Sequence, residues 1–380
     1  QVAFMAPTEV LADQHFKSIL NQAEKMNIKV SLLTGSTKEK ERKILLEKLK
    51  NGDIDILIGT HALIENRVQF HKLGLVIIDE QHKFGVAQRA KLWSKKEELY
   101  PHVLVMTATP IPRTLALTLY GDLDVSIIDE LPLGRKKIIT THRNDNSRLK
   151  VFGFIKQTIK TGGQVYIVYP LIEGSEKKDH KDLMDGFESL KRYFPNEQIG
   201  ILHGRMKSEN KDYEMKRFSN GTTKILVSTT VIEVGVDVPN ASVIIIESAE
   251  RFGLSQLHQL RGRVGRGDRQ SYCILMTKYD ISSESKERIK AMVSSSDGFK
   301  IANMDLKLRG PGNMMGTKQS GLLELRFVNL AEDYTLIKKT REVALNLIEE
   351  DESLKKVENR NIRNYLKNKI KSNINWSRIS

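Results

Sequence analysis

Short apolar runs alternate with longer amphipathic segments over the first third of the chain. The runs are rich in β-branched residues and cover residues 2–7, 29–35, 54–61, 73–78 and 102–110. Runs of this length are typical of strands that are buried on both faces of a parallel sheet. Because helical patterns separate them, we expect an α/β unit with right-handed crossover connections.

The alternation stops at residues 131–137, where proline and glycine precede a basic cluster. A break of this composition is typical of a linker. The alternation then starts again, with apolar runs at residues 164–170, 199–204, 224–230, 242–247 and 271–276. The pattern therefore predicts two α/β units in tandem, although no sequence repeat between them is obvious.

Beyond about residue 284, strand patterns give way to polar helix and loop. Residues 305–312 include glycine and proline and predict a turn-rich loop. From Leu354 onward the chain carries eight Lys or Arg and one acid, Glu358, which is typical of a solvated helix or a frayed tail. We accordingly divide the chain into two α/β units at residues 1–132 and 133–283, a helical coupling region at 284–345 and a basic tail at 346–380.

Composition narrows the class of partner. The 380 residues carry a net charge of +14, which favours a polyanionic partner, most simply nucleic acid. The single cysteine, Cys273, lies in an apolar run, so we expect a buried thiol and no internal disulfide. No apolar run has the length of a membrane span, and the nine histidines lack zinc-ligand spacing. We therefore expect no membrane partner and no structural metal.

Two adjacent acids, Asp79 and Glu80, end the apolar run at residues 73–78. Open α/β sheets bind ligands at the carboxyl ends of their strands. Two carboxylates there need a cation, and Mg²⁺ on a nucleotide phosphate is the usual one. In this interpretation Asp79 holds the metal, largely through water, and Glu80 deprotonates the attacking water. An Asp-Glu pair alone is more often a strand end that leads into a polar loop.

Hydroxyl residues end the next run of the first unit. Thr107 and Thr109 would lie beside the acids, where they could hydrogen-bond the carboxylates and report their state to a neighbouring domain. A threonine-rich strand end capped by a turn is an equally good interpretation of this segment alone.

Two arginines in the second unit are three residues apart, Arg263 and Arg266, and follow Gln259. On a helix this spacing puts both guanidinium groups on one face. If that face looks across a cleft at the acids of the first unit, the arginines can clamp the β- and γ-phosphates as arginine fingers. A basic patch for nucleic acid is the alternative, and it is disfavoured by the acidic strand in the first unit.

The segment at residues 228–239 follows another apolar run. Gly235 permits close approach of the backbone, and Asp237 could accept a hydrogen bond from a ribose hydroxyl or an arginine finger. The small hydroxyl residues at 228–230 suit contacts with nucleic-acid phosphates. A strand end with a glycine turn and no ligand is the interpretation that these residues alone would favour.

Taken together, these segments resemble superfamily 2 helicases, and within them the RecG family of branched-DNA helicases. The resemblance runs from Ala6 to Gly321 and is carried by the acidic segment from Asp79 through Gln81 and His82, by residues 107–114 and by residues 250–267. It implies two RecA-like domains with ATP and Mg²⁺ in the cleft between them. The transcription-repair coupling translocase is similar, but usually has Glu where Gln81 stands.

The resemblance also implies roles for individual residues. Gln259 would help to hold the γ-phosphate, and His82, Gly235 and Asp237 would line the nucleotide site. Arg309 and Gln319 would belong to a helical hairpin that couples the motor to DNA; a purely structural hairpin is the alternative. The residues that would follow the DNA strand are Thr8, Thr34, Gly35, Thr60 and His61 in the first unit, and His203, Gly204, Arg205, Ser228 and Thr229 in the second.

A family member of this kind would remodel stalled replication forks and Holliday junctions by ATP-driven translocation on duplex DNA. The resemblance further implies a monomer in the bacterial cytoplasm, associated with the nucleoid, with single-strand-binding protein as a further partner. A non-enzymatic DNA-binding module and an RNA helicase remain the other classes.

The phosphate loop of the family, Gly-x-x-x-x-Gly-Lys-Thr, does not occur in these residues. Without it no lysine neutralises the β- and γ-oxygens. We therefore expect the C-terminal part of a longer helicase that also carries a wedge domain. We expect residues 1–380 alone to bind ATP weakly and to turn it over negligibly, and the first unit to be the less stable one.

Overall fold

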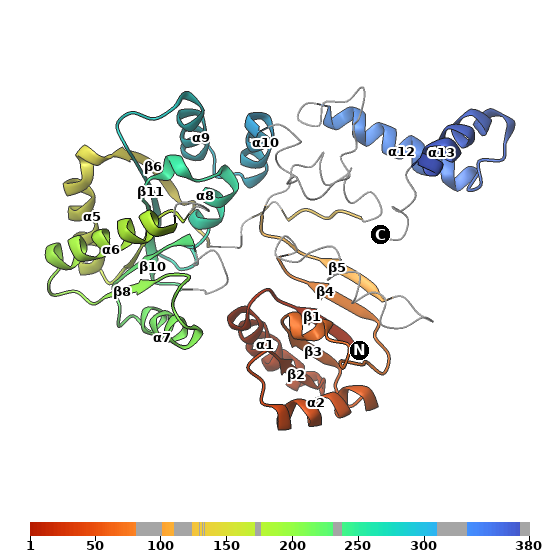
Figure 1. Cartoon of the computed structure of the whole chain (residues 1–380), viewed down its shortest axis with the longest axis horizontal. Helices are drawn as coiled ribbons and strands as arrows, with labels where there is room; N and C mark the ends of the chain where they lie inside the picture. Colours follow the sequence, from red (N-terminus) through yellow and green to blue (C-terminus); the bar gives the residue numbers. More distant parts are fainter. Residues whose placement is uncertain are drawn as a thin grey trace.

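The computed structural model describes residues 1–80, 101–109, 124–128, 130, 132, 134–171, 176–230, 238–309 and 333–372. Two parallel β-sheets, each with its own helices, account for most of these residues (Figure 1). This arrangement confirms the predicted pair of tandem α/β units. The positions of the domain boundaries stay a prediction.

The first sheet has five parallel strands in the order β2-β3-β1-β4-β5. Its strands are β1 (Val2–Met5), β2 (Val30–Leu33), β3 (Ile56–Gly59), β4 (Leu75–Ile78) and β5 (His102–Val105). Helix α1 (Glu9–Ala23) lies between β1 and β2 in the chain, and α2 (Glu39–Asn51) lies between β2 and β3. Strand β4, which precedes the two acids, therefore has β1 on one side and β5 on the other.

The second sheet has six parallel strands in the order β6-β11-β10-β7-β9-β8. They are β6 (Ile139–Asn144), β7 (Gln164–Val168), β8 (Ile199–Leu202), β9 (Ile225–Ser228), β10 (Ala241–Ile246) and β11 (Tyr272–Thr277). The accompanying helices are α5 (Arg148–Lys160), α6 (Glu176–Tyr193), α7 (Ser208–Ser219) and α8 (Leu254–Arg261). All residues of β7, β9 and β10 are buried, as expected for strands covered on both faces. Cys273 is buried in β11, as predicted.

Helices follow the second sheet: α9 (Ser283–Ser294), α10 (Gly298–Arg309), α12 (Tyr334–Glu350) and α13 (Arg360–Ser372). Helices α9 and α10 pack beside α8, whereas α12 and α13 lie apart from the second unit (Figure 1). Among the described helices, none is both long and apolar enough to span a membrane. The prediction of a loop at residues 305–312 is wrong for residues 305–309, because α10 continues to Arg309.

Two further expectations need correction. Strand β6 was not predicted, because its sequence Ile-Thr-Thr-His-Arg-Asn is mostly polar; it lies at the edge of the sheet, where it pairs with β11 alone. Strand β4 is not buried on both faces: Val76 and Ile78 are buried, whereas Leu75 and Ile77 are only partly covered.

Sequence signals position the ends of several elements. Thr8 caps α1, since its hydroxyl accepts a hydrogen bond from the Leu11 N–H at 3.3 Å. Gly52 ends α2 with a φ of +86°, a left-handed conformation that suits glycine. A Cβ at Gly59 would lie 2.1 Å from the Leu33 carbonyl oxygen, so only glycine lets β3 approach β2 this closely.

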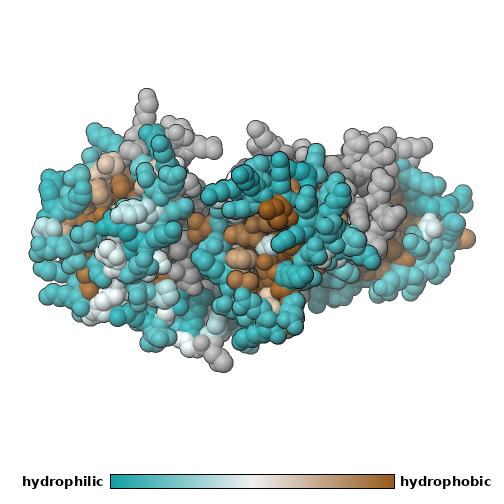
Figure 2. Space-filling view, turned by 90° about the horizontal axis from the view of Figure 1, so that it is seen from below, coloured by the Kyte–Doolittle hydropathy of each residue, from teal (hydrophilic) through white to brown (hydrophobic). Residues whose placement is uncertain are grey.

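The apolar surface of the first unit is less completely covered than that of the second. Leu104 in β5 is 48% exposed, and no residue of β5 is fully buried. Figure 2 shows apolar side chains at the surface in the middle of the molecule, over the first unit.

Limited proteolysis of a polypeptide of residues 1–380 is expected to cleave the first unit before the second. Incomplete burial leaves less apolar area to stabilise the first sheet, so it opens locally at a lower free energy. Mass spectrometry of the early fragments identifies which unit survives. A resistant fragment that contains residues 2–105 and not residues 139–277 would contradict the expectation.

Candidate nucleotide site and nucleic-acid interface

Asp79 and Glu80 emerge at the carboxyl end of β4. The Asp79 N–H donates to the Met5 carbonyl at 2.9 Å, which continues the pairing of β4 with β1. Glu80 then has a φ of +50°, a left-handed conformation that is uncommon for a residue other than glycine. Backbone strain of this kind is typical of functional sites.

Hydrogen bonds fix both carboxylates. Asp79 Oδ1 accepts the Glu80 N–H at 2.9 Å, and Asp79 Oδ2 lies 2.9 Å from Nε2 of His15 on α1. Glu80 Oε2 accepts the Ala108 N–H at 3.3 Å. The segment after β5 thus contacts the acid that ends β4, as the neighbouring positions of these strands require. His15 was not predicted to belong to the site.

The predicted coupling residues Thr107 and Thr109 lie between the two units. The Thr107 hydroxyl accepts the Thr109 N–H at 3.1 Å, which makes a compact turn. Gln259 of α8 donates from Nε2 to the Thr109 hydroxyl. The structure therefore brings together a residue predicted for nucleotide binding in the second unit and a residue predicted for coupling in the first.

The arginine pair is not on a helix, contrary to the sequence-based expectation. Helix α8 ends at Arg261, and Gly262 caps it. Arg263 and Arg266 lie in the following loop, where Gly265 has a φ of +81°. Because the helix has ended before Arg263, and Gly265 between the two arginines has a left-handed conformation, the helical spacing rule does not apply to them.

The two arginines differ in exposure. Arg263 is 9% exposed, whereas Arg266 is partly exposed and donates from Nε to the Gly262 carbonyl at 3.3 Å. The loop is also held by the linker, because Arg135 Nε donates to the Gly265 carbonyl at 2.8 Å. The basic cluster predicted as a linker therefore supports the loop that carries the predicted arginine fingers.

Arg261 has a role that the sequence did not reveal. It is 3% exposed and donates to the carbonyls of Met292, Ser295 and Ser296 at 2.7–3.2 Å. Among the described residues it forms no ion pair with a carboxylate, and burial lowers its pKa. Carbonyl oxygens, together with the His258 Nδ1 at 3.0 Å from Arg261 Nη2, therefore compensate a buried charge, which requires good geometry at every contact. The arginine-rich sequence was a signal, but it did not distinguish this residue from Arg263 and Arg266.

Helix α8 is attached to α10 by a second contact. The Ser255 hydroxyl donates to Asp305 Oδ2 at 3.0 Å, and Asp305 is 1% exposed. Together with Arg261, this bond fixes α8 to the start of the predicted coupling region. The helix that contacts Thr109 through Gln259 is thus also the helix that holds α10.

The candidate DNA-binding residues follow the carboxyl ends of neighbouring strands in each sheet. In the first unit the candidates follow β1, β2 and β3; they are Thr8, Thr34, Gly35, Thr60 and His61. In the second unit they follow β8, lie at the end of β9 or follow β9; they are His203, Gly204, Arg205, Ser228 and Thr229. Parallel strands place all such ends at one edge of their sheet. Each group therefore shares one edge, which is consistent with the prediction but does not test contact with DNA.

Burial separates these candidates into exposed and buried groups, with Thr8 and His203 between them. Gly35, His61, Gly204 and Arg205 are exposed, whereas the side chains of Thr34, Thr60, Ser228 and Thr229 are at most 5% exposed. The buried hydroxyls can shape the strand ends, but as they stand they do not reach a surface. The exposed members are the ones that could contact phosphates directly.

Several predicted site residues lie outside the described residues: Gln81, His82, Gly235, Asp237 and Gln319. The backbone of Arg309 ends α10, but its side chain also lies outside them.

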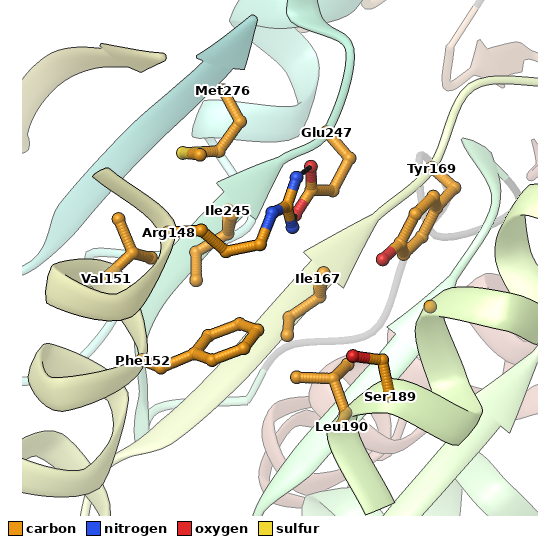
Figure 3. Close-up of a pocket in the computed structure, with 11 residues that line it drawn as sticks. Arg148, Val151, Phe152, Ile167, Tyr169, Ser189, Leu190, Ile245, Glu247 and Met276 are labelled. Carbon is orange, nitrogen blue, oxygen red and sulfur yellow. Dashed lines mark hydrogen bonds and ion pairs between the residues drawn. The ribbon is translucent and has the colours of Figure 1, made fainter. Parts of the chain in front are cut away.

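Two cavities accompany these elements. One, of about 870 Å³, lies between Thr107 and Ala108, the segment that contributes Ile128, Glu130 and residues 135–138, α8 and the start of α10. Asp79, Glu80 and Gln259 are not among its described lining residues. The other, of about 230 Å³, lies in the second unit between α5, α6 and the sheet (Figure 3). Its walls are mostly apolar, and at its polar end Glu247 accepts from both terminal nitrogens of Arg148 at 2.7 and 2.9 Å. Because these charges pair with each other, we regard this cavity as a feature of packing.

Comparison with known proteins identifies the family. The model for ATP-dependent DNA helicase RecG, domain 3, C-terminal, matches residues 295–380; the helicase conserved C-terminal domain matches residues 149–268, and the DEAD/DEAH box helicase model matches residues 1–118. Proteins named ATP-dependent DNA helicase RecG from Synechocystis sp. and Bacillus subtilis are 53% and 50% identical over 355 and 353 residues. The chain belongs to the RecG family. The alignments cover 93% and 92% of this chain but 42% and 51% of those relatives, so the chain spans about half their length or less.

Solved structures agree with this family. A structure of RecG bound to a three-way DNA junction superposes with a TM-score of 0.70 and 47% identity, over 83% of this chain and 41% of that one. Yeast Dbp5 bound to RNA and ADP BeF3 superposes with a TM-score of 0.56 at 17% identity, over 81% of both chains. The second match shows a shared fold alone.

The donor set at the end of β4 fits a magnesium ion carried by a nucleotide. Asp79 and Glu80 supply adjacent carboxylate oxygens, and the Asp79 side chain is 18% exposed. Mg²⁺ in nucleotide sites is usually held by one or two carboxylates together with phosphate oxygens and water. Asp79, already oriented by two hydrogen bonds, is the residue that would hold it.

We expect the stability of the second unit to fall between about pH 6.5 and pH 4 because of His258. Burial, and then the charge of Arg261, lower the pKa of His258 to about 4, while Asp297 acts in the opposite direction. Its neutral Nδ1 lies 3.0 Å from Arg261 Nη2 and can accept its hydrogen bond. The unfolded chain takes up this proton near pH 6.5 but the folded chain only near pH 4, so acid favours unfolding by about 3 kcal/mol at most.

The test compares the chain with His258→Asn, which keeps an acceptor and removes the titrating group. Urea unfolding at pH 7.5, 6 and 5, followed by a probe in the second unit, should show a smaller loss of stability in the variant. Equal losses in the two proteins would contradict the assignment.

Proposed function

We propose that the protein containing these residues is an ATP-driven helicase that translocates on duplex DNA. The observation that carries the proposal is the contact between the units: Glu80 is hydrogen-bonded to Ala108, and the adjacent Thr109 accepts from Gln259. A candidate catalytic acid in one unit is thereby joined, through the adjacent residues Ala108 and Thr109, to the helix that precedes the candidate arginine fingers in the other.

In the proposed reaction each side chain has one task. Bound Mg²⁺ would neutralise charge on the phosphates. Asp79 would hold the ion, and Glu80 would orient the attacking water and accept its proton. Arg263 and Arg266 would stabilise the negative charge that develops on the transferring phosphoryl group. Since Arg263 is almost fully buried, Arg266 is the more accessible of the two.

Release of the γ-phosphate would be sensed where the two units meet. Gln259 would hold the phosphate, and loss of that contact would change its bond with Thr109. His82, Gly235 and Asp237 complete the proposed nucleotide site. Cleft opening would then move α10 with α8, because Ser255 bonds Asp305 of α10 and Arg261 bonds the loop that precedes α10. Arg309 and Gln319 would carry this movement to DNA.

The proposed substrate is branched duplex DNA, such as a stalled fork or a Holliday junction. A net charge of +14 and the shared strand edges support a binding surface for the phosphate backbone. The RecG relative bound to a three-way junction supports this substrate class. Action as a monomer, a bacterial site beside the nucleoid and interaction with single-strand-binding protein belong to the same proposal.

Glu80→Gln is expected to lower DNA-stimulated ATP hydrolysis at least about 100-fold, because an amide cannot accept the proton of water. The assay uses a polypeptide that joins residues 1–380 to a phosphate loop. Glu47→Gln, an exposed change on α2, is the matched control and should leave the rate unchanged. Turnover by the Glu80 variant at the parental rate would refute the proposed chemistry.

Binding to duplex DNA is expected to weaken steeply with salt, since each phosphate contact releases a counterion. Arg205→Ala should weaken binding and lower the slope of log K against log salt by about 1. Arg192→Ala, in the last turn of α6 and thus at the opposite edge of the sheet, should leave the slope unchanged. If the slope of log K against log salt is the same for both variants, Arg205 does not contact a DNA phosphate.

A further inference from the structure

The imidazole of His15 contacts a carboxylate that belongs to the proposed catalytic pair. Nε2 of His15 lies 2.9 Å from Asp79 Oδ2, across 64 residues of sequence. Both side chains are partly buried, with 26% of the histidine and 18% of the aspartate exposed. The contact is therefore shielded from bulk water, which makes it more directional than a pair on the surface.

Packing holds the ring in this orientation. The centroid of the His15 ring lies 4.6 Å from that of Phe4, at an interplanar angle of 33°. Phe4 is 6% exposed and belongs to β1, the strand that pairs with β4. The His15 ring, carried by α1, thus packs against β1, the strand beside the one that precedes Asp79. An ionised carboxylate has acceptors only, so Nε2 is the donor of this hydrogen bond.

The two hydrogen bonds to Asp79 act on different oxygens. The Glu80 N–H reaches Oδ1, and His15 reaches Oδ2. A free carboxylate rotates broadly about its last bond, and donors on both oxygens remove that freedom. The Asp79 carboxylate is therefore held in one orientation by contacts from two different elements.

We infer that His15 is a positioning residue that fixes the Asp79 carboxylate for the magnesium ion of the bound nucleotide. The inference rests on the proposed function, because it takes Asp79 as the residue that holds the metal. Groups that orient metal-binding side chains commonly change metal affinity 10–100-fold when they are removed. His15 does not touch the substrate, so its effect should reach the metal through Asp79 alone.

Two variants of His15 distinguish the effect of its hydrogen-bond donor from the effect of its ring packing. His15→Phe keeps the ring against Phe4 and removes the donor; His15→Gln loses the ring, but its amide nitrogen can reach the position of Nε2. Affinity for Mn²⁺ in the presence of ADP is measured by electron paramagnetic resonance, in the polypeptide that includes a phosphate loop. No turnover is required. Lys17→Ala, which breaks an exposed pair with Asp13 on the same helix, is the control.

His15→Phe is expected to weaken Mn²⁺ binding about 10-fold, and His15→Gln to stay within about threefold of the parent. In an Asp79→Asn background His15→Phe should have no further effect, because the group it positions is gone. Equal losses in the Phe and Gln variants, or an unchanged effect in the Asn background, would overturn the inference. Circular dichroism identifies a variant that has merely unfolded.

The proposed function and this inference fail in different experiments. Normal hydrolysis by Glu80→Gln would refute the function. Parental Mn²⁺ affinity in His15→Phe, together with a hydrolysis-deficient Glu80→Gln, would refute only the role of His15.

Discussion

The hydrogen bond between Gln259 and Thr109 joins the two α/β units at the point where both carry candidate chemistry. On one side, the neighbouring Ala108 N–H contacts Glu80, and Glu80 follows the aspartate that His15 orients. On the other side, Gln259 belongs to α8, whose Arg261 grips the loop before α10. A structural change at Asp79 or Glu80 can therefore reach α10 through a short series of direct contacts. Physical coupling needs such a connected set of groups with more than one arrangement.

Parallel strand order is what makes this series possible. In the first sheet β4 lies between β1 and β5, so the residues after β4 and β5 necessarily meet at one edge. The same rule collects the candidate DNA-binding residues of each unit at their own edge. Sequence positions as far apart as His15 and Asp79 become neighbours because β1 pairs with β4 in register, Met5 beside Ile78.

The sequence pattern predicted the strands well where they are buried and apolar, and it failed where tertiary context decided. Strand β6 is polar because it pairs with β11 alone at the sheet edge, so no periodicity marks it. Arg263 and Arg266 have helical spacing, but α8 ends at Arg261, before both of them. The site acids, Gln259 and Thr109 were predicted from their motifs. His15 and Arg261 were not, because a single histidine and a third arginine acquire their roles only from partners that are distant in sequence.

Arg261 shows why α8 can act as one body. A buried guanidinium compensated by carbonyl oxygens and the neutral His258 Nδ1 loses much of its stabilisation if any contact lengthens, since no carboxylate among the described residues shares its charge. Small relative movements of α8 against the Ser295 and Ser296 carbonyls are therefore costly. Movement of the whole assembly of α8, the loop and α10 leaves these bonds intact. The energetically cheaper motion is thus one in which this assembly moves as a body relative to the first unit, with the contact between Gln259 and Thr109 changing rather than the contacts of Arg261.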